Sequence, residues 1–510
     1  MAARLVNQGW SRQQSVAIAA MAAVAATVLW LAGDRGASDF ALVLLSVGAA
    51  AAVAWLAPSR PVAAFGILFL VASLSGLTVS TRLGNMRLEQ PAIVAGFAAL
   101  LLSPSRLDLS RLRSLLPIGA AFGLYLACLG LSSVFFSLDR VDSLRMTFWT
   151  GLSMSGGLLA FLLLARGSAR ATEWICVSGY VQALVGVLCA VLFFSLGPVL
   201  VTGLYPAPGI AQPLSSLPKV LGLSWEANIY ASLLAAVTIL GLNRFLSGSM
   251  SVGKLLVPIM AGAIALGVTR GAYLGLAAGL AVYVLMGVAP RRLWAPSTVW
   301  RMGIRGAVVG GGAVLGLTAA GVLLVGGRPP TPPLDFTQPG WGRGPVAVES
   351  GQPTKPSPTT ALVQPPPPPD TLSFRLDRVP PALGDLPKSP LIGLGANSFG
   401  QRHSDASQGG APDHIAILAV AALYESGVLG AAGLGIGFAL VLLALFKATR
   451  RRPDRGLIAA YAGAVVSLLV AYEATNALNF ALIWLIAGAG LAASAEPTDP
   501  GQGLTAPLPG

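Results

Sequence analysis

Long apolar runs almost free of charged residues are the feature that most constrains how this chain can fold. A helix needs about 20 mostly apolar residues to cross the ~30 Å hydrocarbon core of a bilayer. Only 10% of the residues are charged, whereas roughly 25% are charged in soluble domains. The sequence therefore predicts an all-α polytopic membrane protein with about 12–14 transmembrane helices and one large external loop. Fourteen candidate runs lie near residues 16–32, 39–57, 61–80, 90–103, 115–136, 148–165, 174–196, 228–246, 253–269, 271–289, 303–326, 420–446, 456–475 and 478–494.

The basic residues of the loops predict an orientation, because Lys and Arg gather in cytoplasmic loops. With the N-terminus inside, the inner segments hold 19 of the 33 basic residues. Seven more lie in the long outer segment 327–412, and the remaining seven lie in or beside short outer loops. Both termini are therefore expected in the cytoplasm. The net charge of +13 follows from this topology and does not indicate nucleic-acid binding.

Composition divides the chain into five parts. Residues 1–326 hold the first eleven predicted transmembrane helices, and residues 327–370 are a proline-rich external linker without a packed core. Apolar residues return in 371–413, which we expect to pack on the membrane domain. Residues 414–496 are expected to form a surface helix and the last transmembrane helices, and 497–510 a disordered tail.

One apolar run is too long for a single crossing. From His414 to Phe446 it has 33 residues, which as a helix would measure ~50 Å at about 1.5 Å per residue. It must tilt strongly, break, or begin outside the membrane, and its glycines offer bending points. We expect a helix on the outer surface through about Leu423, followed by a span. Glu425 would then lie near the outer interface.

Ionisable and amide side chains at membrane-span ends are candidate functional groups, because charge in or beside a span is costly. In the predicted topology the candidates share the outer face although they come from four regions. They are Glu226, Asn228, Arg270, His414, Glu425 and Glu473. Two further arginines, Arg375 and Arg378, lie in the external segment. His403, in the polar text QRHSDASQGG, is expected to be exposed to solvent.

Most of these residues also have an interpretation without function. An acid near a helix N-terminus, such as Glu226 or Asp413, can cap the helix. Arg270 can extend to the interface, and Asn476 and Asn479 in YEATNALNF can hold helices together. Arginine is nevertheless the side chain best suited to grip phosphate in a fork. An outward-facing site for an anionic substrate would combine these groups.

Several kinds of chemistry lack a sequence signal. No glycine-rich loop ending in Gly-Lys-Ser/Thr is present to hold nucleotide phosphates. The three cysteines lie inside apolar runs and are not spaced as metal ligands. The sequence therefore predicts neither a metal nor a cofactor.

Four short sequence motifs, taken in order, resemble those of the O-antigen ligase and polymerase superfamily of bacterial membrane glycosyltransferases. They are the Glu-x-Asn at 226–228, TRGA at 269–272, SPLIGLGANSF at 389–399 and LYESGVLG at 423–430. The resemblance covers roughly Ser224 to Asn479.

The resemblance implies a fold similar to other lipid-dependent (GT-C-like) glycosyltransferases, with its active site on the external face of the bacterial cytoplasmic membrane. It implies a metal-independent transfer of glycan from a polyprenyl-diphosphate donor to a hydroxyl of a glycan, lipid or protein. Arg270 matches the family arginine thought to contact the diphosphate. Glu226 and Asn228 match the family's sequence motif at the eighth span, and Arg375 stands where a loop arginine is often found.

In the family, the helix that carries the fourth motif commonly begins with His-Asn, about nine residues before the Glu-x-Gly. Here Glu425 follows His414 by eleven residues, and two extra residues turn a regular helix by ~200°. The base is therefore left open between His414 and a carboxylate: Glu425, Glu473 or Asp413. Two other functions are also left open, a flippase or transporter of lipid-linked glycan and a non-catalytic partner in envelope assembly.

Overall fold

A bundle of helices makes up most of the described protein. The computed structural model describes residues 37–81, 84–103, 109–164, 168–196, 227–247, 269–287, 375–403, 414–452 and 455–495, with Ser224, Met260 and Ile264. The helices of the first half are α3 (Ala37–Leu56), α4 (Pro61–Ser73), α5 (Glu89–Leu101), α6 (Leu109–Phe135), α7 (Arg140–Leu164), α8 (Ser168–Leu196), α10 (Ala227–Leu246) and α12 (Arg270–Gly287). Those of the second half are α16 (Val379–Asp385), the 3-10 helix η2 (Leu386–Lys388), α17 (Ser398–His403), α18 (Leu418–Arg451), α19 (Arg455–Tyr472) and α20 (Ala481–Ala495).

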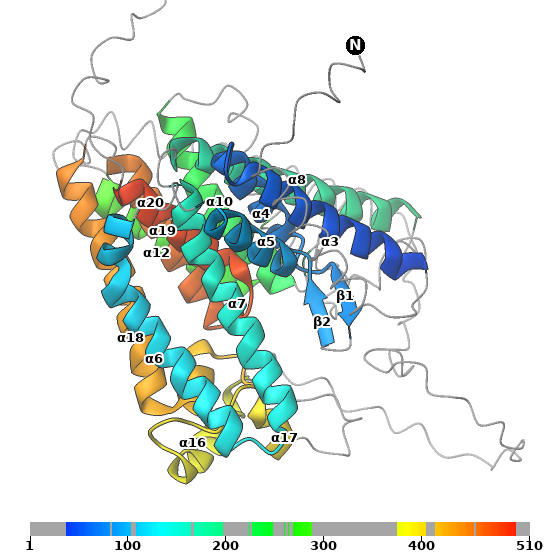
Figure 1. Ribbon diagram of the computed structural model, residues 1–510, viewed down its shortest axis with the longest axis vertical. Coiled ribbons are helices and arrows are strands. Elements are labelled where there is room, and N and C mark those ends of the chain that lie inside the picture. Colours follow the sequence, from blue (N-terminus) through cyan, green and yellow to red (C-terminus); the bar gives the residue numbers. More distant parts are fainter. Residues whose placement is uncertain are drawn as a thin grey trace, which may run out of the picture.

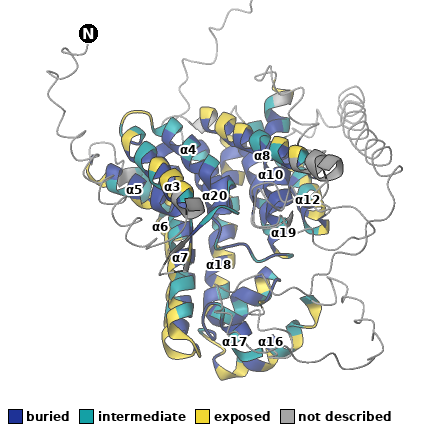
Figure 2. Ribbon diagram, turned by 90° about the vertical axis from the view of Figure 1, so that its right-hand side faces the viewer, coloured by how far each residue is buried: buried dark blue, intermediate teal, exposed yellow. Residues whose placement is uncertain are grey.

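Three long helices give the molecule its shape. In Figure 1, α6, α7 and α18 run from the main body of the bundle to its lower end, where α16 and α17 lie. The buried residues concentrate in the main body, around α4, α10, α19 and α20 (Figure 2). Small residues allow the helices there to pack closely, as in membrane bundles. A methyl group on Gly279 of α12 would collide with the carbonyl oxygen of Gly463 on α19.

In the part of the chain that the structure describes, six helices are long and apolar enough to cross a membrane. They are Arg111–Phe135, Arg140–Leu164, Arg170–Leu188, Arg270–Gly287, Leu418–Arg451 and Arg455–Tyr472. Large apolar side chains on their outer surfaces are exposed, for example Leu116, Leu124 and Leu131 along α6. Exposed apolar stripes of this kind suit a lipid environment, and the fold is that of a mostly helical membrane protein.

Most of the predicted runs contain a helix in the part of the chain that the structure describes. A helix lies in each run except those near 16–32, 253–269 and 303–326, which fall wholly or largely outside the described residues. The linker 327–370 and the tail 497–510 also lie outside them.

The expected span at 61–80 is wrong in its second half. Helix α4 ends at Ser73, and strands β1 (Thr78–Thr81) and β2 (Gly84–Arg87) form an antiparallel hairpin. Val79 pairs with Met86 and both are buried, which points the alternate residues Thr78 and Arg87 the other way. The hairpin is a local departure from the predicted all-α fold.

Helix α18 is broken at Gly427, which is one of the three alternatives that the length of the apolar run left open. Gly427 has φ 67° and ψ −173°, far from helical values. The break lies four residues beyond the expected point at Leu423. It frees the carbonyl oxygens of Tyr424 and Glu425, which would otherwise accept bonds from Val428 and Leu429 inside a regular helix.

The loop at 390–395 takes up the groups that the break frees. The N–H groups of Leu394 and Gly395 donate to the carbonyl oxygens of Tyr424 (2.9 Å) and Glu425 (3.0 Å). In return, the N–H groups of Val428 and Leu429 donate to the carbonyl oxygens of Pro390 (2.9 Å) and Leu391 (3.0 Å). We call these four bonds the loop–helix clamp.

Two glycines make the loop–helix clamp possible. Gly393 (φ 81°) and Gly427 (φ 67°) both have left-handed backbone conformations that other residues rarely adopt. A methyl group on Gly393 would lie 2.5 Å from the backbone nitrogen of Gly427. The clamp thus joins two of the four sequence motifs that carry the family resemblance.

Candidate functional site

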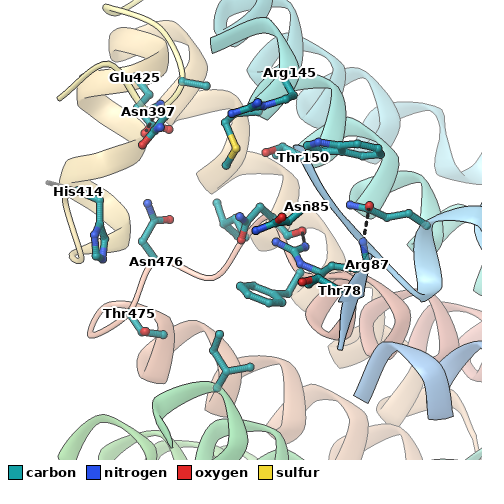
Figure 3. A pocket seen from close by; sticks show the side chains of 18 of the residues that line it. Thr78, Asn85, Arg87, Arg145, Thr150, Asn397, His414, Glu425, Thr475 and Asn476 are labelled. Atoms are coloured by element: carbon teal, nitrogen blue, oxygen red, sulfur yellow. Dashed lines mark hydrogen bonds between the residues drawn. The ribbon is translucent and has the colours of Figure 1, made fainter. Parts of the chain in front are cut away.

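A pocket of about 380 Å³ lies where several separate segments meet (Figure 3). Its walls come from the β-hairpin, α6, α7, the loop before α17, the start of α18 and the loop between α19 and α20. The outer ends and loops in the predicted topology supply most of this lining. The lining includes Thr78, Asn85, Arg87, Tyr125, Arg145, Trp149, Asn397, His414, Glu425, Asn476, Asn479 and Phe480.

Glu425 lines this pocket and is held from two sides. The N–H of Asn397 donates to its Oε1 at 3.0 Å, while no described residue donates to Oε2. Asn397 has a left-handed backbone (φ 54°), and its side-chain Nδ2 donates to Asp142 at 2.9 Å. Figure 3 shows Glu425 and Asn397 side by side at one edge of the pocket. The carboxylate is thereby oriented, with one oxygen available to a ligand.

Serine hydroxyls seat the loop–helix clamp against α6 and α7. Ser132 of α6 donates to the carbonyl oxygen of Glu425 at 2.8 Å. Ser143 of α7 donates to the carbonyl oxygen of Ala396 at 2.7 Å, next to Asn397. The position of Glu425 is therefore fixed by backbone and side-chain contacts from three elements.

His414 lines the same pocket from an extended stretch. Residues 414–417 precede α18, whose N-cap is Ile417, and Asp413 lies outside the described residues. Asn476, which has φ 42°, donates from Nδ2 to the carbonyl oxygen of Ile415 at 3.3 Å. His414 is exposed, and in the view of Figure 3 Asn476 lies between it and Arg87. The irregular backbone explains how two residues eleven positions apart can share one pocket.

Arg87 is a pocket residue that the sequence analysis did not single out. Its side chain is only 12% exposed. The guanidinium lies over the ring of Phe480, 3.8 Å from the centroid, and Nη1 donates to the carbonyl oxygen of Asn479. The signal in the sequence was an outer-side arginine, in the text GNMRLEQ, with an acid two residues later. A second pocket cation, Arg145 of α7, pairs with Asp142.

Glu473 and Asn228 lie near the pocket but do not line it. The exposed Glu473 accepts a hydrogen bond on Oε2 from the N–H of Ala419 at 3.1 Å, so it caps the start of α18. Asn228 is half-buried at the start of α10, and its neighbour Ile229 is the one that contributes to the lining. Glu226 lies outside the described residues.

The three predicted arginines also do not line the pocket. Arg270 is exposed as the first residue of α12. Arg375 and Arg378 are half-buried in the segment before α16. Among the described residues, the cations that the pocket does contain are Arg87 and Arg145.

A second polar cluster lies beside the pocket, around Asp385. The expectation that His403 is exposed to solvent is wrong, because its Nε2 lies 2.8 Å from Asp385 Oδ2 and its ring packs against Phe399. Lys388 and the hydroxyl of Tyr424 also donate to Asp385. Burial alone would raise the pKa of Asp385, but these hydrogen bonds outweigh it and hold the pKa below its ordinary value. The cluster anchors Tyr424, the residue before Glu425.

Metal ligation has no candidate in the part of the chain that the structure describes. No three His, Cys, Asp or Glu side chains gather there closely enough to hold an ion. The groups that face the pocket are instead guanidinium, carboxylate, imidazole, amide and aromatic side chains.

Comparison of the chain with protein-family models and with curated proteins finds no match. What indicates a function is therefore the chemistry of the pocket and the short sequence motifs that the structure brings together.

Proposed function

We propose that the protein is an envelope polysaccharide ligase or polymerase. It would transfer a glycan from a polyprenyl-diphosphate donor to a hydroxyl acceptor on the external face of the bacterial cytoplasmic membrane. The observation that carries the proposal is the pocket that combines Arg87 and Arg145 with Glu425 and His414. The loop–helix clamp adds support, because it joins two sequence motifs that resemble those of the ligase and polymerase superfamily.

The proposed transfer makes one bond and breaks one bond. A base takes the proton of the acceptor hydroxyl, and the oxygen attacks the anomeric carbon of the donor sugar. The bond from that carbon to the diphosphate oxygen breaks, and polyprenyl diphosphate leaves with the electron pair. Negative charge grows on the phosphate oxygens, so fixed cationic donors stabilise the transition state. The energy is stored in the donor, and no nucleotide is consumed.

We assign the base to Glu425. Its Oε1 is held by Asn397 at 3.0 Å, which leaves Oε2 to accept the acceptor proton. His414 lines the same pocket on an exposed, extended stretch and remains the alternative base. Glu473 is a weaker candidate, because its carboxylate caps α18 and does not line the pocket.

The cations and aromatic rings of the pocket suit the two halves of the donor. Arg87 and Arg145 would contact the diphosphate, since guanidinium groups match phosphate oxygens in a fork. Trp149 and Tyr125 offer flat apolar faces for a sugar ring. A volume of about 380 Å³ is within the usual range of small-ligand sites, about 300–1,000 Å³. It suits the reacting sugar and its diphosphate, while the rest of the glycan and the lipid tail extend outside.

The test is glycan profiling of the native host with the gene deleted and then restored. Restoring Glu425→Gln should leave the envelope without the glycan while the protein stays in the membrane. A matched control is Glu173→Gln, which removes an acid paired with Arg244 on α10, away from the pocket lining. Loss of all glycan modification in the deletion indicates a ligase, and single-unit modification indicates a polymerase.

The same strain distinguishes the alternatives. An unchanged glycan profile after deletion would refute the proposal. Purified protein in liposomes that moves lipid-linked glycan across the bilayer without forming a bond would identify a transporter instead.

A further inference from the structure

A buried acid lies directly behind the pocket arginine. Glu89 is the first residue of α5, and its side chain is 1% exposed. Neither of its carboxyl oxygens has a hydrogen-bond partner among the described residues. The Nη1 of Arg87 lies 3.9 Å from Oε1, which is too far for a hydrogen bond but close enough for strong attraction. A buried carboxyl without donors is unusual and calls for a functional explanation.

The surroundings of Glu89 contain few other charges. Helix α5 packs against α3, α4, α7 and β2, and α3 and α4 add no charged side chain that the structure describes. Helix α7 contributes Arg145, which lines the pocket and is paired with Asp142, together with Arg140 at its start. Tyr472 of α19 is also near, since it interacts with Arg87, and its buried hydroxyl has no described partner. Among the described side chains, Arg87 is thus the one charge in direct contact with Glu89.

Burial favours the neutral form of this acid. It raises the pKa of Glu89 to about 7, against the opposing attraction of Arg87. Helix α5 has 13 residues and is not among the six helices long enough to span a membrane. The nearby residues Arg87 and Gln90 line the pocket, so a proton can reach the carboxyl from the pocket side.

Arg87 has donors to spare for a ligand. Of its five guanidinium N–H groups, the structure engages Nη1 with the carbonyl oxygen of Asn479. The ring of Phe480 fixes the plane of the guanidinium. An ionised Glu89 would offset the charge of Arg87 and repel a phosphate placed on its other side. A neutral Glu89 would leave the whole charge of Arg87 to the ligand.

We propose that the pocket binds a phosphate group through Arg87, and that Glu89 takes up one proton from solvent as the phosphate binds. The proton is released again when the phosphate leaves, so charge is balanced at each step. Glu89 is a positioning residue that acts through Arg87 and does not touch the ligand. The inference rests on the proposed function for the nature of the donor, and it deepens it by adding proton exchange to phosphate binding.

The expected size of the effect follows from the fraction of protein in the binding form. At pH 8 about one molecule in eleven would have Glu89 protonated, so the affinity should be ~11-fold weaker than that of a chain with a neutral residue there. At pH 6 about nine in ten are protonated, and the difference should fall to ~1.1-fold.

The experiment measures binding to the purified full-length chain in detergent between pH 6 and 8. The probes are geranyl diphosphate, which carries a lipid tail, and inorganic pyrophosphate, which does not. Glu89→Gln should bind geranyl diphosphate about tenfold more tightly than wild type at pH 8 and equally at pH 6. Glu173→Gln, which removes the acid of another Glu–Arg pair, should match wild type throughout. Any titration of the probe itself cancels in these comparisons.

Arg87→Lys tests the other half of the proposal. It keeps the charge but loses the fork, so it should bind the probe at least tenfold more weakly in a chain with unchanged thermal stability. Tight binding of both probes would indicate a site for free phosphate, and binding that needs the tail would indicate a lipid phosphate.

Two results would overturn the inference. One is a Glu89→Gln chain of normal thermal stability that binds no more tightly at pH 8, and the other is a difference between variants that does not change with pH. Binding does not require the transfer reaction, so the two proposals fail separately. A chain that binds as expected but leaves the host glycans unchanged on deletion would refute the glycosyltransferase function alone.

Discussion

Replacing Gly427 by alanine should destabilise the loop–helix clamp and remove activity. Gly427 has φ 67° and ψ −173°, a region that residues with a side chain avoid. An added methyl group would also lie 2.5 Å from the backbone nitrogen of Gly393 and closer still to the carbonyl of Leu391. The chain must either keep the break under strain or close α18 into a regular helix.

The size of the effect can be worked out for both routes. Keeping the break costs about 1–3 kcal/mol of backbone strain, before any movement to relieve the contact. Closing the helix loses the four bonds of the clamp and regains two helical bonds at Val428 and Leu429. At about 1 kcal/mol per bond the net loss is ~2 kcal/mol, partly offset by up to ~1 kcal/mol because alanine favours helix. We therefore expect a loss of about 1–3 kcal/mol, with Glu425 displaced from the pocket.

The assay combines thermal unfolding of the purified protein with glycan profiling in the host. Gly435→Ala is the matched control, because Gly435 lies in the same helix, is exposed, and has open space where a methyl group would be added. That variant should be as stable as wild type or up to ~1 kcal/mol more stable, since alanine is the better helix former. Equal stability and activity of the two variants would refute the role of the clamp.

Three further outcomes are expected. Glu425→Gln should reduce transfer by at least a hundredfold without loss of stability, whereas His414→Asn should reduce it less than tenfold; the reverse order in the host glycan assay would make His414 the base. Asp385→Asn should lower the free energy of unfolding by about 1–3 kcal/mol, because one amide oxygen replaces the two charged oxygens that bind Tyr424, His403 and Lys388. The pKa of Asp385 is lowered in the folded state, so its contribution should be complete above the ordinary value of 3.8 and should be lost as pH falls through the lower folded value, which acid unfolding of wild type against Asp385→Asn would measure.

The sequence could predict what depends on local composition. The apolar runs identified the described helices other than α16, η2 and α17, because crossing a membrane demands length and low charge. The same length argument required the run from His414 to tilt strongly, break or begin outside the membrane, and a break is found at Gly427. The position of polar side chains beside apolar runs singled out His414 and Glu425, which the structure brings to one pocket.

The parts that could not be predicted depend on contacts between distant segments. The clamp pairs residues 390–395 with residues 424–429, and nothing in the residue spacing within either motif encodes that pairing. Arg87 was hidden because a short apolar stretch such as LTVS can be read as either helix or strand. His403 was expected in solvent because its acceptor, Asp385, lies 18 residues earlier in the chain.

The β-hairpin gives the pocket a second purpose. Helices α4 and α5 have 13 residues each, so each rises ~20 Å, about 10 Å short of a hydrocarbon core. If the helix ends away from the hairpin, at Pro61 and Leu101, lie near the cytoplasmic side, the strands that join the two helices lie below the level of the outer headgroups. Backbone at that depth is tolerated only where it is buried in protein or faces a water-filled cavity. Water in the pocket, which reaches the hairpin at Thr78 and Asn85, would then be part of what holds the fold together. A bulky side chain that fills the pocket would cost stability as well as access for the ligand.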